Sequence, residues 1–208
     1  MANISNFPGF EKIGSFVINL TNSNTLWNFI KDNPSDKRIG SHTYLIVVNN
    51  LVKKLGCSVT KLNNCAGYGV GNGGSPSDRT TGIHYFIAKE LNEGKIVEFY
   101  AKMCPKIDKI EINDLFNNTS IIKNVYIDPK QIEQHYLNSF KEKFSILPEW
   151  NMQEQGRNSD WPENIKTIRN ALCQKKIIEY KSEHNKCQYM MLYHNKYNKE
   201  LISKINST

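Results

Sequence analysis

Two runs of strand-forming residues on either side of an Asn-Asn pair constrain the fold of this chain more than any other feature. The first run, Thr43–Val48, and the second, Leu51–Gly56, are rich in β-branched and aliphatic residues, which suit a pleated sheet. Asn tolerates the positive φ angles of a two-residue hairpin turn, so Asn49-Asn50 predicts a tight turn between the runs. The sequence therefore predicts a β-hairpin here.

Two amphipathic helices and a third strand are predicted after the hairpin. The first helix begins near Asp78 and ends at Asn92-Glu93-Gly94, and a strand follows over Lys95–Met103. The second helix begins at Asp128-Pro129, because proline suits the first turn of a helix. Apolar residues recur at helical spacing in both helices: Ile83, Phe86, Ile87 and Leu91 in the first, and Ile132, Tyr136, Leu137 and Phe140 in the second. These elements predict an α+β fold with a small, mainly antiparallel sheet flanked by helices.

The remaining segments carry weaker signals. A short helix is predicted over Thr25–Lys31, because capping residues precede it and Asn33-Pro34 follows it. Residues 63–78 and Asn113–Asn118 are predicted to be loops, the first rich in glycine and the second polar. The tail predicts a helix over residues 163–172, then a hairpin and an amphipathic C-terminal helix. We therefore expect the tail to be a folded addition to the domain.

The charge balance favours a polyanionic partner. The 208 residues include 27 Lys and Arg against 20 Asp and Glu, which gives a formal net charge of +7 and a pI near 9.1. Such an excess suits DNA or RNA, and no basic amphipathic helix indicates a membrane surface. The alternative is that the charge serves solubility alone. Arginine is rare, so a site that needs a guanidinium group must use Arg38, Arg79, Arg157 or Arg169.

Several classes of protein are disfavoured by what the chain lacks. No apolar stretch approaches the roughly 18–20 residues of a membrane span, and the N-terminus has no signal-peptide pattern. The five cysteines are scattered without a C-x-x-C pair, which argues against structural zinc and against a disulfide framework. We therefore expect a cytoplasmic protein with reduced thiols and no membrane partner.

Two familiar kinds of site find little support. The glycine-rich segment at 63–78 is not followed by Lys-Ser or Lys-Thr and lacks the dinucleotide-binding spacing, so it predicts a loop rather than a phosphate cradle. A nucleophilic Cys-His pair could be drawn from Cys57 or Cys104 with His84 or His135. No local pattern distinguishes these cysteines from ordinary buried thiols.

A dispersed set of four residues carries more chemical content. Tyr44 lies in the first predicted strand, and Lys54 lies ten positions later in the second. Arg79 opens the first helix, and Glu133 lies on the second, which ends before Pro148-Glu149-Trp150-Asn151. Residues of these types in this order resemble the GIY-YIG nuclease family.

The resemblance can be followed residue by residue. His42-Thr43-Tyr44 stands where the family has Gly-Ile-Tyr, and Lys54-Leu55-Gly56 stands where it has Tyr-Ile-Gly. Ser58 fits the family's Gly-x-Ser, and a lysine takes the place of the second tyrosine in some restriction endonucleases of the family. The chain departs from the pattern in lacking the first Gly-Ile and in the long loop before Arg79.

The resemblance implies metal-dependent hydrolysis of phosphodiester bonds. Glu133 would bind Mg²⁺, or Mn²⁺, to polarise a phosphate oxygen and the leaving group; Mg²⁺ accepts a single protein carboxylate because it keeps several waters. Tyr44 would orient or deprotonate the attacking water. A phenol with a pKa of about 10 can do so near neutrality only if a nearby charge favours its anion. Lys54 would supply that charge.

The same resemblance implies how the substrate is held. Arg79 would clamp phosphate oxygens, assisted one helical turn later by His84 or by its rival Tyr85. Contacts to DNA would fall to residues outside the catalytic set: Asn151, Arg157, Asn158, Lys175 and Lys176. We expect one domain over residues 1–208, with the catalytic core at 42–151 and additions for DNA recognition and dimerisation at 1–41 and 152–208.

The expected function is that of a sequence-specific type II restriction endonuclease that cuts double-stranded DNA. Because one Glu133 site serves one strand, cutting both strands predicts a homodimer. Apolar residues outside the core are expected at the dimer interface: Phe16, Trp27, Phe29, Tyr189, Met190 and Met191. Two alternatives remain open, a homing or mobile-element nuclease of the same family and a basic nucleic-acid-binding protein without catalysis.

Overall fold

Seven strands and two α-helices make up the part of the chain that the computed structural model describes. The described residues are 2–18, 27–38, 40–59, 68, 77–113, 120–152 and 154. The chain divides into two compact units, the first of Met1–Gly14, Lys31–Asn64 and Glu98–Asn151, and the second of Ser15–Ile30, Cys65–Val97 and Met152–Thr208.

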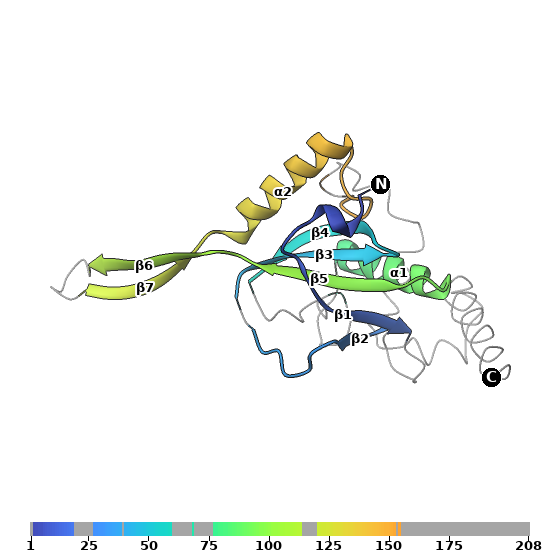
Figure 1. Ribbon diagram of the computed structural model, residues 1–208, viewed down its shortest axis with the longest axis horizontal. Helices are drawn as coiled ribbons and strands as arrows, with labels where there is room; N and C mark the ends of the chain where they lie inside the picture. Colours follow the sequence, from blue (N-terminus) through green and yellow to red (C-terminus); the bar gives the residue numbers. More distant parts are fainter. Residues whose placement is uncertain are drawn as a thin grey trace. The chain divides into compact units, whose positions relative to one another are not determined.

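Five of the strands form one antiparallel sheet with the order β2-β1-β5-β3-β4 (Figure 1). Its strands are β1 (Glu11–Ile18), β2 (Trp27–Lys31), β3 (His42–Val48), β4 (Leu51–Ser58) and β5 (Val97–Met103). The helices are α1 (Asp78–Asn92) and α2 (Pro129–Phe144), and a 3-10 turn, η1, covers Ile4–Asn6. The predicted α+β fold with a small, mainly antiparallel sheet is confirmed.

The central hairpin forms as the sequence predicts. β3 and β4 pair antiparallel, with Tyr44 opposite Gly56 and Ile46 opposite Lys54. Asn49 and Asn50 have φ angles of 46° and 67°, the left-handed values that a tight two-residue turn requires. The pairing shifts register between Ile46 and Val47, toward the turn. In the part of the hairpin farther from the turn, side chains alternate regularly between the two faces of the sheet.

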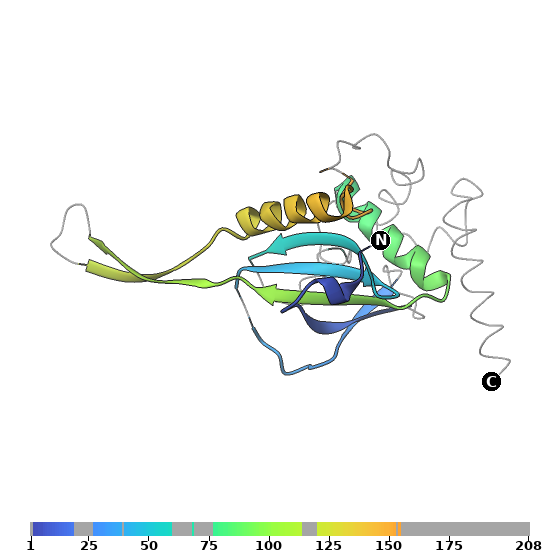
Figure 2. The same ribbon diagram turned by 45° about the horizontal axis from the view of Figure 1, so that its top comes forward.

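One face of the hairpin packs against α2, which runs beside the hairpin in Figure 2. Leu45, Val47 and Leu55 of the hairpin form a buried cluster with Leu137 and Phe140 of the helix. Burying each such side chain contributes about 1.5–3 kcal/mol relative to leaving it exposed. The predicted apolar stripe therefore sets which side of α2 faces the sheet.

Local signals explain where both helices begin. The Asp128 side chain accepts a hydrogen bond from the Lys130 amide at 3.0 Å, and Pro129 occupies the first turn of α2. In α1, Ser77 accepts from the Thr80 amide at 3.1 Å, and the chain turns at Gly94 with a φ of 75° after the helix ends. Both predicted helices are confirmed.

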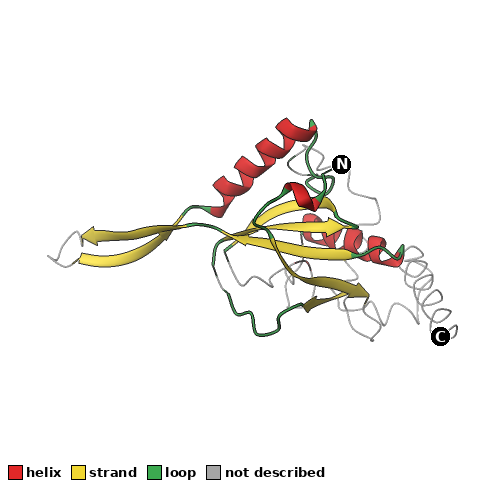
Figure 3. Cartoon of the chain, viewed as in Figure 1, coloured by secondary structure: helices red, strands yellow, loops and turns green. Residues whose placement is uncertain are grey.

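The helix predicted over Thr25–Lys31 is wrong, because the described part of this segment is strand β2 (Figure 3). Its burial alternates, with Trp27 inside and Asn28 outside, which is the period of a strand. Trp27 packs edge to face on Phe16 of β1, at 4.9 Å between ring centroids, and the two side chains are 3% and 2% exposed. Pairing in the sheet thus outweighs the capping signals. Phe16 and Trp27, which were expected at a dimer interface, are thus buried in the core of the second unit.

A second two-stranded sheet was not predicted. β6 (Lys106–Asn113) and β7 (Ser120–Tyr126) pair antiparallel with each other. Asn113, which was expected in a polar loop, is the last residue of β6, and the rest of that predicted loop lies outside the described residues. Strand β1 was also missed. The glycine-rich segment before Ser77, apart from Tyr68, and the predicted tail elements lie outside the described residues.

Neither described helix has the length and hydrophobicity that a membrane-crossing segment requires.

Candidate active site

Polar side chains lie on one face of the β3–β4 hairpin, among buried apolar residues. Side chains alternate between the two faces of a strand, and Tyr44 and Lys54 lie two steps apart in the paired register. The two side chains therefore share a face and are diagonal neighbours. Leu45 and Leu55, one residue along, point to the other face and into the α2 core. Tyr44 is 6% exposed and Lys54 only 1%.

Gly56 makes room for the tyrosine ring. A Cβ atom placed on Gly56 would overlap the Tyr44 ring at Cζ and Oη and would lie 2.9 Å from Cε1. The opposite side of the ring stacks on Phe99 of β5, with 5.2 Å between centroids and 23° between planes. Glycine is therefore required at the end of the Lys54-Leu55-Gly56 motif, because the Tyr44 ring on the paired strand occupies the space that a side chain would take.

The burial of Lys54 is costly unless its charge is balanced. A charged ammonium loses several kcal/mol of hydration on entering a protein interior. A lysine placed this deep beside a tyrosine is therefore a candidate for function rather than for solubility.

His42, which stands at the first position of the motif, lies on the same face and is 1% exposed. Burial lowers the pKa of His42, and its Nδ1–H donates to the Gly40 carbonyl at 2.9 Å.

Glu133 lies at the end of the same hairpin, on the second turn of α2, next to Cys57. Burial raises the pKa of Cys57 to about 12, and a hydrogen bond to Glu133 and the negative charges of Glu133 and Asp128 add to the effect. The thiol therefore stays protonated and donates to the carboxylate. Sequence reasoning missed this contact, because no local pattern links β4 with α2.

Glu133 and the Tyr44–Lys54 pair approach the hairpin from opposite faces. Cys57 is paired with Thr43, so it points away from the face that carries Tyr44. β4 is the edge strand of the five-stranded sheet. Groups on the two faces of the sheet are therefore separated by this one strand where the sheet ends. Glu133 thus contacts β4 at Cys57, near the end of the strand, whereas Lys54 lies in the middle of β4 and Tyr44 on the neighbouring strand.

The described residues offer one carboxylate rather than a preformed metal cage. No group of three or more His, Cys, Asp or Glu side chains in the described part of the chain could hold a metal ion. Glu133 is a hard oxygen ligand, and the protonated Cys57 beside it is a poor one. This donor set fits Mg²⁺ or Mn²⁺ taking its other ligands from water and substrate, and it does not fit structural zinc.

Both cysteines proposed as nucleophiles are unsuited to that role. Burial raises the pKa of Cys104 as it does that of Cys57, so neither forms a thiolate readily near neutral pH. Their surroundings are those of ordinary buried thiols, the alternative that the sequence left open.

Arg79, His84 and Tyr85 lie on α1 in the second unit. Arg79 is half-buried in the first turn of the helix, and Tyr85 is 6% exposed. His84 is fully buried: its Nδ1–H donates to the Tyr68 carbonyl at 2.8 Å, and its ring packs on Trp27. Burial lowers its pKa to about 4. A neutral core histidine is a poor proton donor, and Tyr85 stays the alternative partner for Arg79.

Asn151 was expected to contact DNA, and the structure shows its side chain bound to the edge strand β4. It is fully buried, and both ends of its amide bind one residue of the edge strand. The Leu55 amide donates to Asn151 Oδ1 at 3.0 Å, and Asn151 Nδ2 donates to the Leu55 carbonyl at 2.9 Å. Asn151 is a positioning residue that holds β4 between Lys54 and Gly56.

The other residues expected to contact DNA, Arg157, Asn158, Lys175 and Lys176, lie outside the described residues, as do Tyr189, Met190 and Met191.

Comparisons with known proteins come from structure alone, since neither a protein-family model nor a curated protein matches the sequence. The chain is similar to a mutant of EndoII from bacteriophage T4, with a TM-score of 0.46 and 21% identity over 71% of this chain and 96% of that one. It is also similar to the restriction endonuclease HPY188I in complex with product DNA, with a TM-score of 0.38 and 16% identity over 71% of this chain and 84% of that one. Likeness at this level carries no argument about function, which depends on the residues of this chain.

Substituting Gly56→Ala should destabilise the protein by about 1–3 kcal/mol, because the new methyl group overpacks the Tyr44 ring. Urea denaturation of the single variant and of the Gly56→Ala/Tyr44→Ala double variant measures the effect. The cost of the methyl group should shrink when the ring is removed. An equal cost in both backgrounds would show that Tyr44 does not lie over Gly56.

Acid should weaken the fold through His84. Its folded-state pKa of about 4 lies below the usual 6.5, so between these values the unfolded chain binds a proton that the folded chain refuses. The free energy of unfolding should therefore fall as the pH drops from 6.5 to 4, by up to about 3 kcal/mol from this residue. An NMR titration of the His84 imidazole checks the cause, and a midpoint near 6.5 would contradict it.

Proposed function

We propose that this protein is a divalent-metal-dependent endonuclease of double-stranded DNA, of the type II restriction kind. The observation that carries the proposal is the burial of Tyr44 and Lys54 as neighbours on one face of the hairpin, with the Glu133 carboxylate beside Cys57 on the other face of the same hairpin. Hydrolysis of a phosphodiester needs an attacking hydroxide, charge neutralisation on the phosphate and help for the leaving oxygen. Each need has a matching side chain in this set.

Tyr44 is proposed to accept the proton of the attacking water. A phenol is a weak base in water, and a neighbouring positive charge makes its anion accessible. Lys54 lies diagonally opposite on the same face and is shielded from solvent, where its charge acts more strongly than at the surface. Stacking on Phe99 and the space above Gly56 hold the ring in place, so that little reorientation is needed.

Glu133 is the proposed metal ligand. Mg²⁺ or Mn²⁺ held there would polarise a phosphate oxygen and stabilise the leaving oxygen. The Cys57 thiol donates a hydrogen bond to the carboxylate and keeps it oriented without competing for the ion. Arg79, in the first turn of α1, is proposed to bind phosphate oxygens through its guanidinium fork.

Restriction-type specificity is the finer part of the proposal. The net charge of +7 supports a polyanionic substrate. Base readout is assigned to the tail, through Arg157, Asn158, Lys175 and Lys176. A homing or mobile-element nuclease and a silent DNA-binding protein are the alternatives.

Incubation with long DNA of mixed sequence and Mg²⁺, followed by sequencing of the ends, distinguishes these functions. A restriction enzyme yields discrete fragments whose ends share one short sequence. Ends scattered at random would overturn sequence specificity. Binding without cleavage in both Mg²⁺ and Mn²⁺ would overturn the catalytic proposal in favour of a binding protein.

Replacing Glu133 with Gln should lower the cleavage rate by at least about 10²-fold, the loss that removing one charge-stabilising group causes in other enzymes. DNA binding without metal should persist, because the carboxylate holds the ion rather than the DNA. Glu142→Gln, an exposed position on the same helix, is the matched control and should cut normally. Tyr44→Phe should also lose most activity, since only the hydroxyl is removed. Normal cleavage by either Glu133→Gln or Tyr44→Phe would remove that residue from the mechanism.

Cleavage of both strands is proposed to require two copies of the chain. Each copy would contribute one Glu133 and one Tyr44–Lys54 pair to one strand, and a two-fold assembly would match a nearly palindromic site. Sedimentation with cognate DNA and Ca²⁺ in place of Mg²⁺ should give two chains per duplex. A single bound chain that still cuts both strands together would exclude this assembly.

A further inference from the structure

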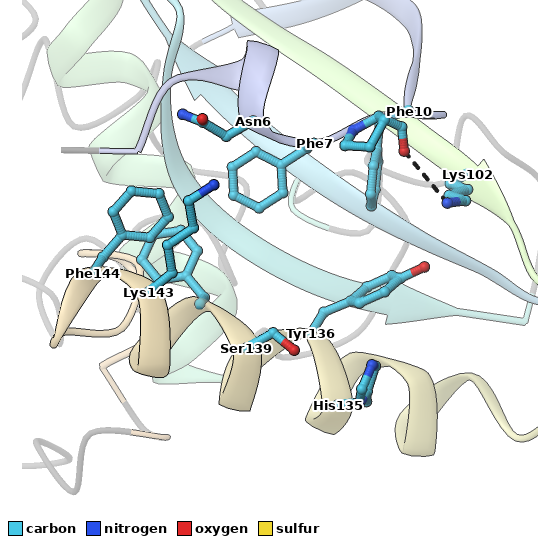
Figure 4. A pocket seen from close by; sticks show the side chains of 11 residues that line it. Asn6, Phe7, Phe10, Lys102, His135, Tyr136, Ser139, Lys143 and Phe144 are labelled. Carbon is cyan, nitrogen blue, oxygen red and sulfur yellow. Dashed lines mark hydrogen bonds between the residues drawn. The ribbon is translucent and has the colours of Figure 1, made fainter.

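A pocket of about 260 Å³ lies between the N-terminal segment, strand β5 and helix α2, within the first unit (Figure 4). Its walls include five aromatic side chains, Phe7, Phe10, Tyr136, Phe140 and Phe144. Two lysines, Lys102 and Lys143, also line it. No carboxylate is among the described residues that line this pocket, so its polar character is cationic.

The wall formed by the N-terminal segment is held firmly to the central hairpin. The Ile4 amide donates to the Asn50 carbonyl and the Val52 amide to the Ala2 carbonyl, both at 2.8 Å. The Asn3 side chain caps the 3-10 turn by accepting from the Ser5 amide at 3.0 Å. The opposite wall, α2, is fixed by the buried core. The pocket is therefore largely formed in advance of any ligand.

Lys102 is built into one side of the pocket. Gly9, at a φ of 80°, leaves room for it, since a Cβ at this position would lie 3.1 Å from Lys102 Nζ. The same nitrogen donates to the Pro8 carbonyl at 3.4 Å and lies 6.0 Å from the ring centroids of both Phe10 and Tyr136. Its positive charge is thus held over the aromatic side chains.

Lys143 supplies a second charge from the helix. Its Nζ lies 5.6 Å from the centroid of the Phe144 ring, and Figure 4 shows the side chain rising from α2 toward Phe7. Ser139, on the turn between Tyr136 and Lys143, adds a hydroxyl to the same wall. The pocket therefore offers aromatic surface, hydrogen-bonding groups and two ammonium groups.

These features select one class of ligand. A cation is disfavoured, because the lysines already place positive charge against the rings. The volume is below the roughly 300–1,000 Å³ of pockets that enclose drug-sized molecules, so a single planar ring system fits better than a larger body. Aromatic side chains beside cationic groups are the combination that binds an unstacked base and its phosphate.

We propose that this pocket binds a single unstacked nucleotide, with its base against the aromatic side chains and its phosphate near Lys102 and Lys143. The site is separate from the Tyr44–Lys54 pair and needs no metal. Its helix residues begin two positions after Glu133 and end at Phe144, so they lie about 3–17 Å along the α2 axis from it, at about 1.5 Å per residue. A nucleic-acid strand that reaches Glu133 therefore passes within a few nucleotides of the pocket.

The proposal can be tested on the full chain in the absence of divalent metal, so that failure of cleavage does not affect the outcome. Calorimetric titrations use deoxyadenosine monophosphate, a short oligothymidylate and inorganic phosphate. We expect saturable binding of at least one of the first two, and no comparable binding of phosphate. Tight binding of the oligonucleotide alone assigns the pocket to single-stranded nucleic acid, and tight binding of the mononucleotide assigns it to a free nucleotide.

Variants of the pocket complete the test. Lys143→Ala and Tyr136→Leu should each weaken binding by about tenfold or more, as expected from losing a phosphate contact or a stacking surface. Lys141→Ala is the matched control, because this lysine is exposed on the last turn of α2 and does not line the pocket. Equal losses in Lys141→Ala and Lys143→Ala would show general charge attraction and would overturn the proposal. Absence of saturable binding in the unaltered chain, or equal affinity for inorganic phosphate, would also overturn it.

Discussion

The pairing of Tyr44 with Gly56 across the β3–β4 hairpin is the contact on which the rest of the candidate site depends. The tyrosine ring lies over a residue without a side chain, and the register that places it there also brings Lys54 to the same face as Tyr44. Leu45 and Leu55 are sent to the α2 core by the same register. A slip of one residue would exchange the two sets, placing the lysine against the helix and the leucines on the face that carries Tyr44. One register therefore serves both stability and chemistry.

Several interactions remote from the site protect that register. The left-handed Asn49-Asn50 turn fixes where the hairpin reverses. Asn151 binds both backbone groups of Leu55, so the segment after α2 clamps the edge strand between Lys54 and Gly56. An edge strand has only one strand neighbour, and such a clamp supplies hydrogen bonds that a second neighbour would otherwise make. Polar residues far apart in the chain thus act on the geometry of one strand.

Electrostatics divide the buried polar groups into two kinds. His42, His84 and the two described cysteines are neutral, because burial disfavours their charged forms. Lys54 and Glu133 are the groups for which the proposed chemistry requires charge; Lys54 belongs to β4, and Glu133 contacts the same strand at Cys57. The pocket beside α2 adds a separate cationic surface lined with aromatic rings. Glu133 and most of the residues that line this pocket thus belong to the same helix, α2.

Short-range patterns in the chain were sufficient for the hairpin, for both helices with their caps, and for the order of Tyr44, Lys54, Arg79 and Glu133 along these elements. Such features depend on the conformational preferences and spacing of neighbouring residues. Four features depended on the tertiary structure. They are the strand found where a helix was predicted over Thr25–Lys31, the β6–β7 pair, the burial of Asn151 and the hydrogen bond from Cys57 to Glu133. Each of them is decided by contacts between segments distant in sequence, whose free energy exceeds the local preferences and leaves no periodic trace in the chain.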